Sequence, residues 1–259
     1  MIASKNLLFR TYHSGLCSFP ARAFSTKGGD KQKFFLFFFG APGVGKGTYS
    51  KRLAKDLKLN EVSTGDELRA IIKGTTTGYD PKFVKEITET VNSGKFVSDN
   101  IVFDIIKKKI DESERGIILD GFPRNAEQFK KYKELFPLHL VVNFFLRKDV
   151  LVDKLLGRRI CEKCGGNYNI CDIKDGEYDM EPLLPSNCTQ CKEGEFLKER
   201  ADDTKEIIER RLQDYEEKTA PLLSLFEKDG VLVNFEPKKG VKDYPEIRRI
   251  VQERLKIDQ

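Results

Sequence analysis

The stretch that most constrains this chain is residues 34–57, where an apolar run meets a glycine-rich loop. Residues 34–39 read Phe-Phe-Leu-Phe-Phe-Phe. An unbroken apolar run of this length is typical of a strand buried on both faces of a parallel sheet. Residues 40–48 follow directly as Gly-Ala-Pro-Gly-Val-Gly-Lys-Gly-Thr. Glycines permit the positive φ angles that turn backbone N–H groups toward one anion. Residues 46–57 then have helical periodicity, so we expect a strand, an anion-binding loop and a helix.

This arrangement predicts a site for nucleotide phosphate groups. A helix N-terminus with free N–H groups lies at the loop, and Lys46 adds a movable positive charge for the β- and γ-phosphates. The standard loop pattern has Ser or Thr directly after the lysine, whereas here Gly47 intervenes and Thr48 carries the hydroxyl. An ordinary glycine-rich turn is the alternative. The order of strand, loop, lysine and helix favours the phosphate site, but it does not specify the reaction.

Composition narrows the classes of protein that this chain represents. Its 259 residues, 39% of them hydrophobic, are enough for one sizeable core or two modest ones. The longest apolar stretch is far shorter than a membrane span. The net charge is +5, yet four of the basic residues lie within residues 1–29, which contain no acid. The remaining 42 basic and 41 acidic residues make a nearly neutral body, which argues against nucleic-acid binding.

The first 29 residues have the composition of a mitochondrial or chloroplast transit peptide: basic, acid-free and rich in Ser, Thr, Ala and Phe. They lack the apolar core of a secretory signal. Residues 22–25, Arg-Ala-Phe-Ser, resemble a mitochondrial processing site with cleavage near Phe24. We therefore expect residues 1–27 to be a mitochondrial transit peptide, and the protein to lie in the matrix or intermembrane space. A plastid address and a disordered cytosolic tail are the alternatives.

Two further segments carry candidate site residues. Residues 63–69, Ser-Thr-Gly-Asp-Glu-Leu-Arg, follow a second predicted strand and begin a helix. Residues 116–124 read Gly-Ile-Ile-Leu-Asp-Gly-Phe-Pro-Arg, a third buried strand with Asp120 at the carboxyl end, where open α/β sheets bind ligands. A carboxylate there suits Mg²⁺ held through water. Arg124 leaves the same turn, within reach of a transferred phosphoryl group.

Together, residues 40–48, 63–69 and 120–124 resemble the adenylate kinases, and the glycine between Lys46 and Thr48 belongs to that family's loop. The resemblance runs from about Phe34 to the C-terminus. It implies an α/β, P-loop NTPase-like three-layer fold with a five-stranded parallel sheet and two inserted subdomains. The implied ATP site comprises Gly43, Val44, Gly45, Lys46, Gly47, Thr48, Lys154 and Arg158. The implied AMP site comprises Thr64, Arg69, Val97, Gly121, Arg124, Gln128, Arg200 and Arg211, with Gln128 reading the adenine edge.

The resemblance also implies the reaction, reversible transfer of the γ-phosphoryl group of Mg·ATP to AMP to give two ADP. Its expected catalytic groups are Lys46, Arg124, Arg158, Arg200 and Arg211, which together with Mg²⁺ at Asp120 offset charge on the transferring oxygens. The expected partners are ATP, AMP and ADP, with no nucleic acid and no membrane span, in a monomer. A GTP:AMP phosphotransferase and a non-catalytic nucleotide- and zinc-binding module are the alternatives. The retained arginines argue against the second.

Four cysteines predict a zinc site. Cys161 and Cys164 form one Cys-x2-Cys pair, and Cys188 and Cys191 form another. Two such pairs complete a tetrahedron of thiolates, and a long loop over residues 172–187 accommodates the wide spacing. Two disulfides or no metal are the alternatives. The family resemblance makes this segment the mobile lid and the zinc structural.

The resemblance divides the chain into parts. The core P-loop domain is expected at residues 34–62, 99–157 and 202–259, the AMP-binding subdomain at 63–98 and the zinc-type lid at 158–201. Asp202 is predicted to cap the helix that carries Arg211. The family often has arginine where this chain has Lys154, and a lysine cannot stack on the donor base in the same way. The donor base therefore stays open between ATP and GTP.

Overall fold

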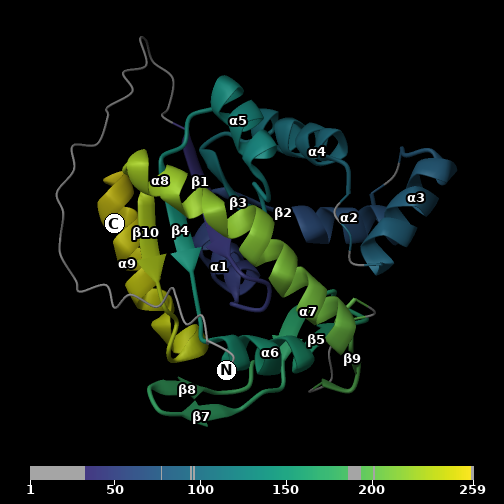
Figure 1. The fold of residues 1–259 in the computed structure, drawn as a ribbon, viewed down its shortest axis with the longest axis vertical. Coiled ribbons are helices and arrows are strands. Elements are labelled where there is room, and N and C mark those ends of the chain that lie inside the picture. Colours follow the sequence, from purple (N-terminus) through teal and green to yellow (C-terminus); the bar gives the residue numbers. More distant parts are fainter. Residues whose placement is uncertain are drawn as a thin grey trace, which may run out of the picture.

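A five-stranded parallel sheet forms the centre of the computed structural model, which describes residues 33–76, 78–93, 95, 97–185, 194–200 and 202–257. The strands lie in the order β10-β4-β1-β3-β2 (Figure 1). Their bounds are β1 Phe34–Gly40, β2 Asn60–Ser63, β3 Gly116–Asp120, β4 Leu140–Phe144 and β10 Leu232–Phe235. The predicted sheet is confirmed. The predicted transit peptide, residues 1–27, lies outside the described residues.

The aromatic run occupies the central strand. β1 pairs with β3 on one side and β4 on the other. Phe35, Phe37 and Phe39 pack into one hydrophobic cluster, whereas Leu36 and Phe38 pack into a second cluster on the opposite face. Successive side chains of a strand point to opposite faces, so a strand covered on both sides must be apolar throughout.

Helices cover both faces of the sheet and make the predicted three-layer α/β fold. The cluster around Leu36 includes side chains of α1 Lys46–Leu57, α6 Lys148–Leu156, α7 Lys205–Asp214 and α9 Tyr244–Leu255. The cluster around Phe37 includes α2 Thr64–Ile72, α3 Pro81–Asn92, α4 Asp99–Asp111, α5 Ala126–Leu135 and α8 Leu223–Lys228. Between α7 and α8 the chain stays helical, through a π turn (Tyr215–Thr219) and a 3-10 turn (Ala220–Leu222). A 3-10 turn at Gly240–Asp243 precedes α9.

Two insertions project from the core (Figure 1). The first contains α2 and α3. The second follows α6 and contains two antiparallel sheets. We call the three-stranded one the cysteine sheet: β5 Arg158–Cys161, β6 Asn167–Asn169 and β9 Leu197–Lys198. The other is a hairpin of β7 Ile173–Asp175 and β8 Tyr178–Met180, in place of the predicted loop over residues 172–187.

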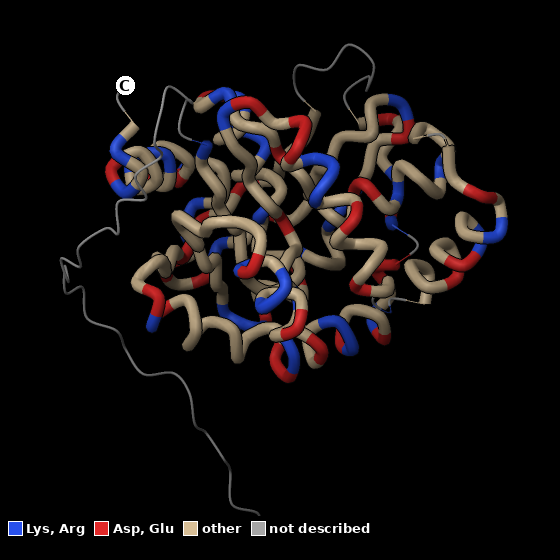
Figure 2. The backbone as a smooth tube through the Cα atoms, turned by 90° about the horizontal axis from the view of Figure 1, so that it is seen from above, with Lys and Arg blue, Asp and Glu red and all other residues tan. Residues whose placement is uncertain are grey.

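Charged residues are mixed along the chain. Figure 2 shows Lys and Arg interspersed with Asp and Glu through the described residues. This mixture agrees with the nearly neutral body expected from the sequence. Within the same residues, no helix is both long and apolar enough to cross a bilayer.

Candidate active site

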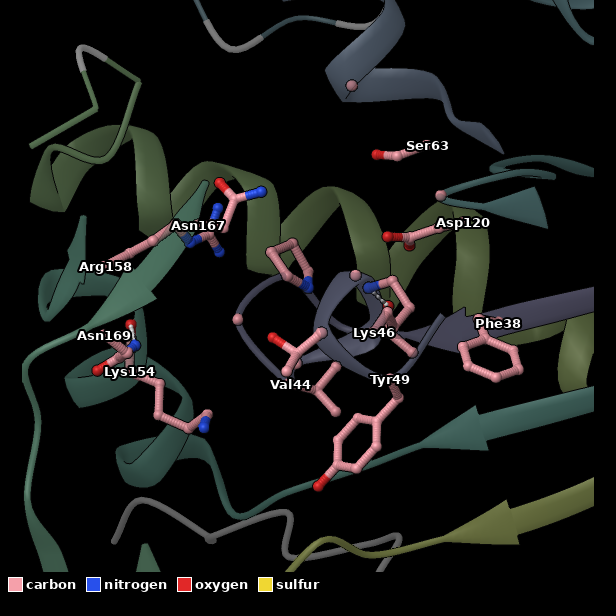
Figure 3. Close-up of a pocket in the computed structure, with 18 of the residues that line it drawn as sticks. Phe38, Val44, Lys46, Tyr49, Ser63, Asp120, Lys154, Arg158, Asn167 and Asn169 are labelled. Carbon is pink, nitrogen blue, oxygen red and sulfur yellow. Dashed lines mark hydrogen bonds between the residues drawn. The ribbon is translucent and has the colours of Figure 1, made fainter. Parts of the chain in front are cut away.

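A groove at the carboxyl ends of β1 and β3 gathers most of the predicted site residues (Figure 3). Those that line it are Gly43, Val44, Gly45, Lys46, Gly47, Thr48, Arg69, Asp120, Gly121, Arg124, Lys154, Arg158, Arg200 and Arg211. Thr64, Val97 and Gln128 are buried and do not line it. The predicted donor and acceptor residues therefore share one groove, and the exceptions lie on the acceptor side.

The phosphate loop requires its glycines. Gly40, Gly43 and Gly45 have φ angles of 132°, 88° and 101°, which side chains rarely allow. A Cβ at Gly40 would lie 2.1 Å from the Phe144 carbonyl oxygen, so a side chain there would collide with β4. Gly45 is the N-cap of α1 and offers no capping side chain. The N–H groups of Lys46 and Gly47 are therefore left for an anion, whereas the Thr48 N–H donates to the Gly45 carbonyl oxygen at 2.9 Å.

Lys46 is folded back on its own loop. Its Nζ donates to the carbonyl oxygens of Gly40 at 2.8 Å and Ala41 at 3.0 Å (Figure 3). Burial lowers the pKa of Lys46 to about 8, even though the Asp120 carboxylate opposes that shift. The buried Lys46 ammonium has too little negative charge around it to keep its usual pKa. A bound nucleotide phosphate would supply that charge.

Asp120 is placed to hold a hydrated cation. Its side chain approaches Lys46 across the phosphate loop (Figure 3), and burial raises its pKa. A Cβ at Gly47 would lie 3.2 Å from Asp120 Oδ2, so the carboxylate lies against the start of α1. Carboxylate and hydroxyl oxygens are the ligands that Mg²⁺ accepts, usually with several waters retained. Asp120 thus fits the predicted magnesium site, and Thr48 lines the same groove.

The acceptor side is held together by the turn after β3. Arg124 Nε donates to the Gly121 carbonyl oxygen at 2.8 Å, and the Thr64 hydroxyl donates to the same oxygen at 3.2 Å. Burial, followed by the charge of Arg211, lowers the pKa of Arg124 to about 10. Arg69 is bonded to Asp66 at 2.5 Å. The turn therefore fixes a buried positive charge at the wall of the groove.

Gln128 is engaged with the protein at both ends of its amide. Its Oε1 accepts from the Arg124 backbone N–H at 2.7 Å, and its Nε2 donates to Asp99 Oδ1 at 2.6 Å. The residue is only 4% exposed. A role in reading adenine would require at least one of these bonds to exchange for the base.

Three arginines reach the groove from the second insertion and α7. Arg158 Nε lies 3.5 Å from Asp203 Oδ2, and Arg211 contacts Asp202 at 3.0 Å and Asp203 at 3.3 Å. Burial, followed by the charge of Arg158, lowers the pKa of Arg200 to about 9. Such shifts reflect positive charge crowded away from water, the condition that a polyanionic ligand relieves.

The prediction that Asp202 caps α7 is wrong. The N-cap of α7 is Thr204, whose Oγ1 accepts from the Ile207 N–H at 3.4 Å. The Asp202 carboxylate instead pairs with Arg211. The ion pair with Arg211 engages the carboxylate, and the threonine hydroxyl takes the capping role.

The far end of the groove includes Tyr49 and Cys171, which sequence reasoning missed, as well as the predicted Lys154. Tyr49 points away from Asp120 (Figure 3), and its hydroxyl donates to the Gly240 carbonyl oxygen at 2.5 Å. Lys154 Nζ lies 3.7 Å from Met180 Sδ, and burial lowers its pKa. Cys171 also lines the groove. The one feature of the sequence that could have pointed to Tyr49 as a groove residue is its position directly after Thr48 of the phosphate loop.

Comparison with known proteins agrees with this geometry. A family model described as adenylate kinase matches residues 38–231. The chain is 38% identical to a GTP:AMP phosphotransferase of Plasmodium falciparum (83% of this chain, 95% of the relative) and 38% identical to adenylate kinase 1, chloroplastic, of Arabidopsis thaliana (85% and 77%). It is 33% identical to an adenylate kinase of Bacillus subtilis (83% and 97%). The chain belongs to the adenylate kinase family.

As an adenylate kinase, the protein is an enzyme that transfers phosphoryl groups between nucleotides, and it is a long-form member with a lid. The groove has the parts that such a reaction needs. The phosphate loop and Lys46 line the same groove as Arg69, Arg124, Arg158, Arg200 and Arg211.

The first cysteine pair of this adenylate kinase forms a tight turn. Cys161 N–H donates to the Gly166 carbonyl oxygen at 3.0 Å, and Gly165 N–H donates to the Cys161 carbonyl oxygen at 2.9 Å. The Gly166 N–H donates to Cys164 Sγ at 3.3 Å. Cys188 and Cys191 lie outside the described residues. Within the described ranges, no three ligand side chains form a metal-binding group.

Proposed function

We propose that this adenylate kinase uses Mg·ATP as donor and AMP as acceptor. The observation that carries the proposal is the excess of buried positive charge in one groove, from Lys46 and the arginines. Two polyanionic nucleotides repel each other, and this charge offsets their repulsion as negative charge spreads over the transferring oxygens. No covalent nucleophile is needed.

Each residue then has a defined role. Lys46 leaves the Gly40 and Ala41 carbonyls to bind the β- and γ-phosphates, joined by the first-turn N–H groups of α1. Asp120 and Thr48 hold hydrated Mg²⁺, which supplies charge neutralisation when bound. Arg124 contacts the transferring phosphoryl group, and Arg158, Arg200 and Arg211 approach from the lid side. Thr64, Arg69, Val97, Gly121 and Gln128 form the AMP site.

GTP is the second candidate donor. One relative is named a GTP:AMP phosphotransferase, and Lys154 at the far end of the groove cannot stack on a base as arginine does. Steady-state rates with ATP, GTP, CTP and UTP against AMP decide between the donors. We expect the highest kcat/KM with ATP. A higher value with GTP would overturn the choice of donor and leave the family unchanged.

We also propose that residues 63–98 and 158–201 move on the core formed by residues 34–62, 99–157 and 202–259, excluding water when they close. The lid would hold one structural Zn²⁺ through Cys161, Cys164, Cys188 and Cys191. The tight turn at Cys161–Gly166 supports this, because it brings the two cysteines of the pair onto one short turn and its Gly166 N–H donates to Cys164 Sγ, as in a metal-binding knuckle.

The N-terminal segment is proposed to be an organelle-targeting peptide over residues 1–27. Its acid-free basic composition supports import, and chloroplastic relatives from rice and Arabidopsis favour a plastid over the mitochondrion. Mass spectrometry of the protein from its native source tests this proposal. We expect a mature N-terminus near Phe24 in an organelle fraction. An intact Met1 in an organelle-free fraction would contradict import.

A further inference from the structure

The backbone of Arg124 is fastened on both sides by buried side chains from different helices. Its N–H is bonded to Gln128 Oε1, at the start of α5, at 2.7 Å. Its carbonyl oxygen accepts from Thr219 Oγ1 at 2.8 Å. Thr219 is 95 positions away in the sequence, lines the groove and is 7% exposed. A buried bond between such distant segments fixes the place from which the guanidinium extends.

Thr219 owes its place to an irregularity in its helix. It is the last residue of the π turn Tyr215–Thr219, which interrupts the helical stretch between α7 and α8. A π turn accommodates one extra residue, and each residue of an α-helix turns the chain by about 100°. The π turn therefore changes the face on which later residues lie, and π turns are frequent at functional sites.

The same helical stretch carries a second site residue. Arg211 lies on α7, four positions before the π turn, where it contacts Asp202 and Asp203. One continuous stretch thus holds the Arg211 guanidinium and the hydroxyl that bonds the Arg124 carbonyl. Because Arg211 and Thr219 lie on one continuous helical stretch, the guanidinium groups of Arg211 and Arg124 are held in a fixed position relative to each other.

We propose that Thr219 is a positioning residue for phosphoryl transfer: its hydroxyl holds the Arg124 carbonyl and so sets the reach of the Arg124 guanidinium. This inference rests on the proposed role of Arg124 at the transferring phosphoryl group. It goes beyond that role, because the Thr219 hydroxyl acts through its bond to the Arg124 backbone carbonyl.

The test replaces the hydroxyl and keeps the size of the side chain. Thr219→Val should lower kcat about 10-fold and change KM for either nucleotide less than about twofold, because the lost bond acts in the transition state. Thr219→Ser should restore kcat to within about twofold of the native value. Ser113→Ala is the matched control, because its buried hydroxyl also bonds a carbonyl, that of Ile110, away from the groove. It should leave kcat unchanged.

A double-mutant cycle separates this inference from the role of Arg124. Arg124→Ala should lower kcat about 10²-fold, and adding Thr219→Val should then cause less than a twofold further loss. An unaltered kcat in Arg124→Ala would overturn the proposed role of Arg124. A full additional 10-fold loss in the double variant, or no loss in Thr219→Val, would overturn positioning by Thr219. If the valine variant does not fold, Thr219→Ala takes its place in the same cycle.

Discussion

The two small sheets of the second insertion are stabilised in different ways. Ile173, Tyr178 and Met180 of the β7–β8 hairpin belong to a core cluster, together with side chains of α1 and α9. None of the described residues of the cysteine sheet belongs to either core cluster. The hairpin therefore shares the core of the protein, whereas the cysteine sheet has too few apolar residues for a core of its own.

Polar contacts strengthen the attachment of the hairpin. Tyr178 donates to Glu236 Oε1 at 2.6 Å and accepts from the Arg147 N–H at 3.3 Å. The Asp179 N–H donates to the Lys238 carbonyl oxygen at 2.9 Å. The contacts with Glu236 and Lys238 join the hairpin to the segment between β10 and α9, and the contact with Arg147 joins it to the start of α6. A segment without such packing needs another source of stability, which the proposed zinc site would supply to the cysteine sheet.

The largest predicted effect belongs to the cysteine sheet. Cys161→Ser should lower zinc from one per chain to below about 0.2, and it should reduce activity more than 10-fold at temperatures where the sheet unfolds. Elemental analysis and the temperature dependence of kcat measure both effects. Cys171→Ser is the matched control and should keep one zinc. Full zinc content in Cys161→Ser would rule out this thiolate as a ligand.

The pH dependence of kcat/KM tests the core side of the groove independently of the two small sheets. The pKa of Lys46 lies near 8, below its ordinary value of 10.5, so the free enzyme loses this positive charge as pH rises through 8. We expect kcat/KM for the triphosphate to fall about tenfold per pH unit above 8. The unfolded chain binds more protons than the folded one between pH 8 and 10.5, so this lysine makes stability rise over that window.

The same pH profile in Tyr178→Phe would place the titrating group outside the hairpin. A profile that is flat up to pH 10 in the native protein would contradict the assignment to Lys46.

The hairpin should give an intermediate effect on the donor. Met180 and Ile173 line the groove, so loosening the hairpin should weaken binding of the triphosphate. Tyr178→Ala leaves a cavity at a buried ring and should raise KM for the triphosphate about 10-fold. Tyr178→Phe removes only the hydroxyl and should raise it about threefold. Both variants should keep one zinc. Loss of zinc in either would show that the two sheets are coupled.

The smallest predicted effect concerns the exposed ion pairs of the hairpin. Lys242 contacts Glu181 at 2.6 Å, and Lys238 contacts Glu177, with both carboxylates in solvent. Exposed pairs contribute little and are screened by salt. Glu181→Gln should change KM for the triphosphate by less than about twofold at low ionic strength and leave it unchanged at high. A fivefold change would mean that these pairs hold the hairpin closed.

Much of the fold and of the site can be predicted from the sequence, because single residues determine these features. Glycines at 40, 43 and 45 and the aromatic run before them predict the phosphate loop and the buried strand. The start of the helix at Pro81–Asn92 is also readable, because Asp80 caps it and Pro81 suits its first turn.

Contacts between distant segments are not readable in the same way. The bonds from Thr219 to Arg124 and from Tyr49 to Gly240 depend on the completed fold. The Asp202 carboxylate has two local options, a cap and an ion pair, and the fold selects the second. The hairpin was predictable in principle, because Asp175-Gly176 lies between short alternating segments and Gly176 has a φ of 60°. A loop was expected here instead, because this segment connects the two cysteine pairs.

Hydrogen exchange with and without a zinc chelator tests the central claim, that the two sheets depend on different interactions. Removing zinc should abolish protection of the amides in Arg158–Cys161, Asn167–Asn169 and Leu197–Lys198. The amides of Ile173–Asp175 and Tyr178–Met180 should keep their protection, because core packing holds the hairpin. Simultaneous loss of protection in both sheets, or no loss in the cysteine sheet, would contradict the claim.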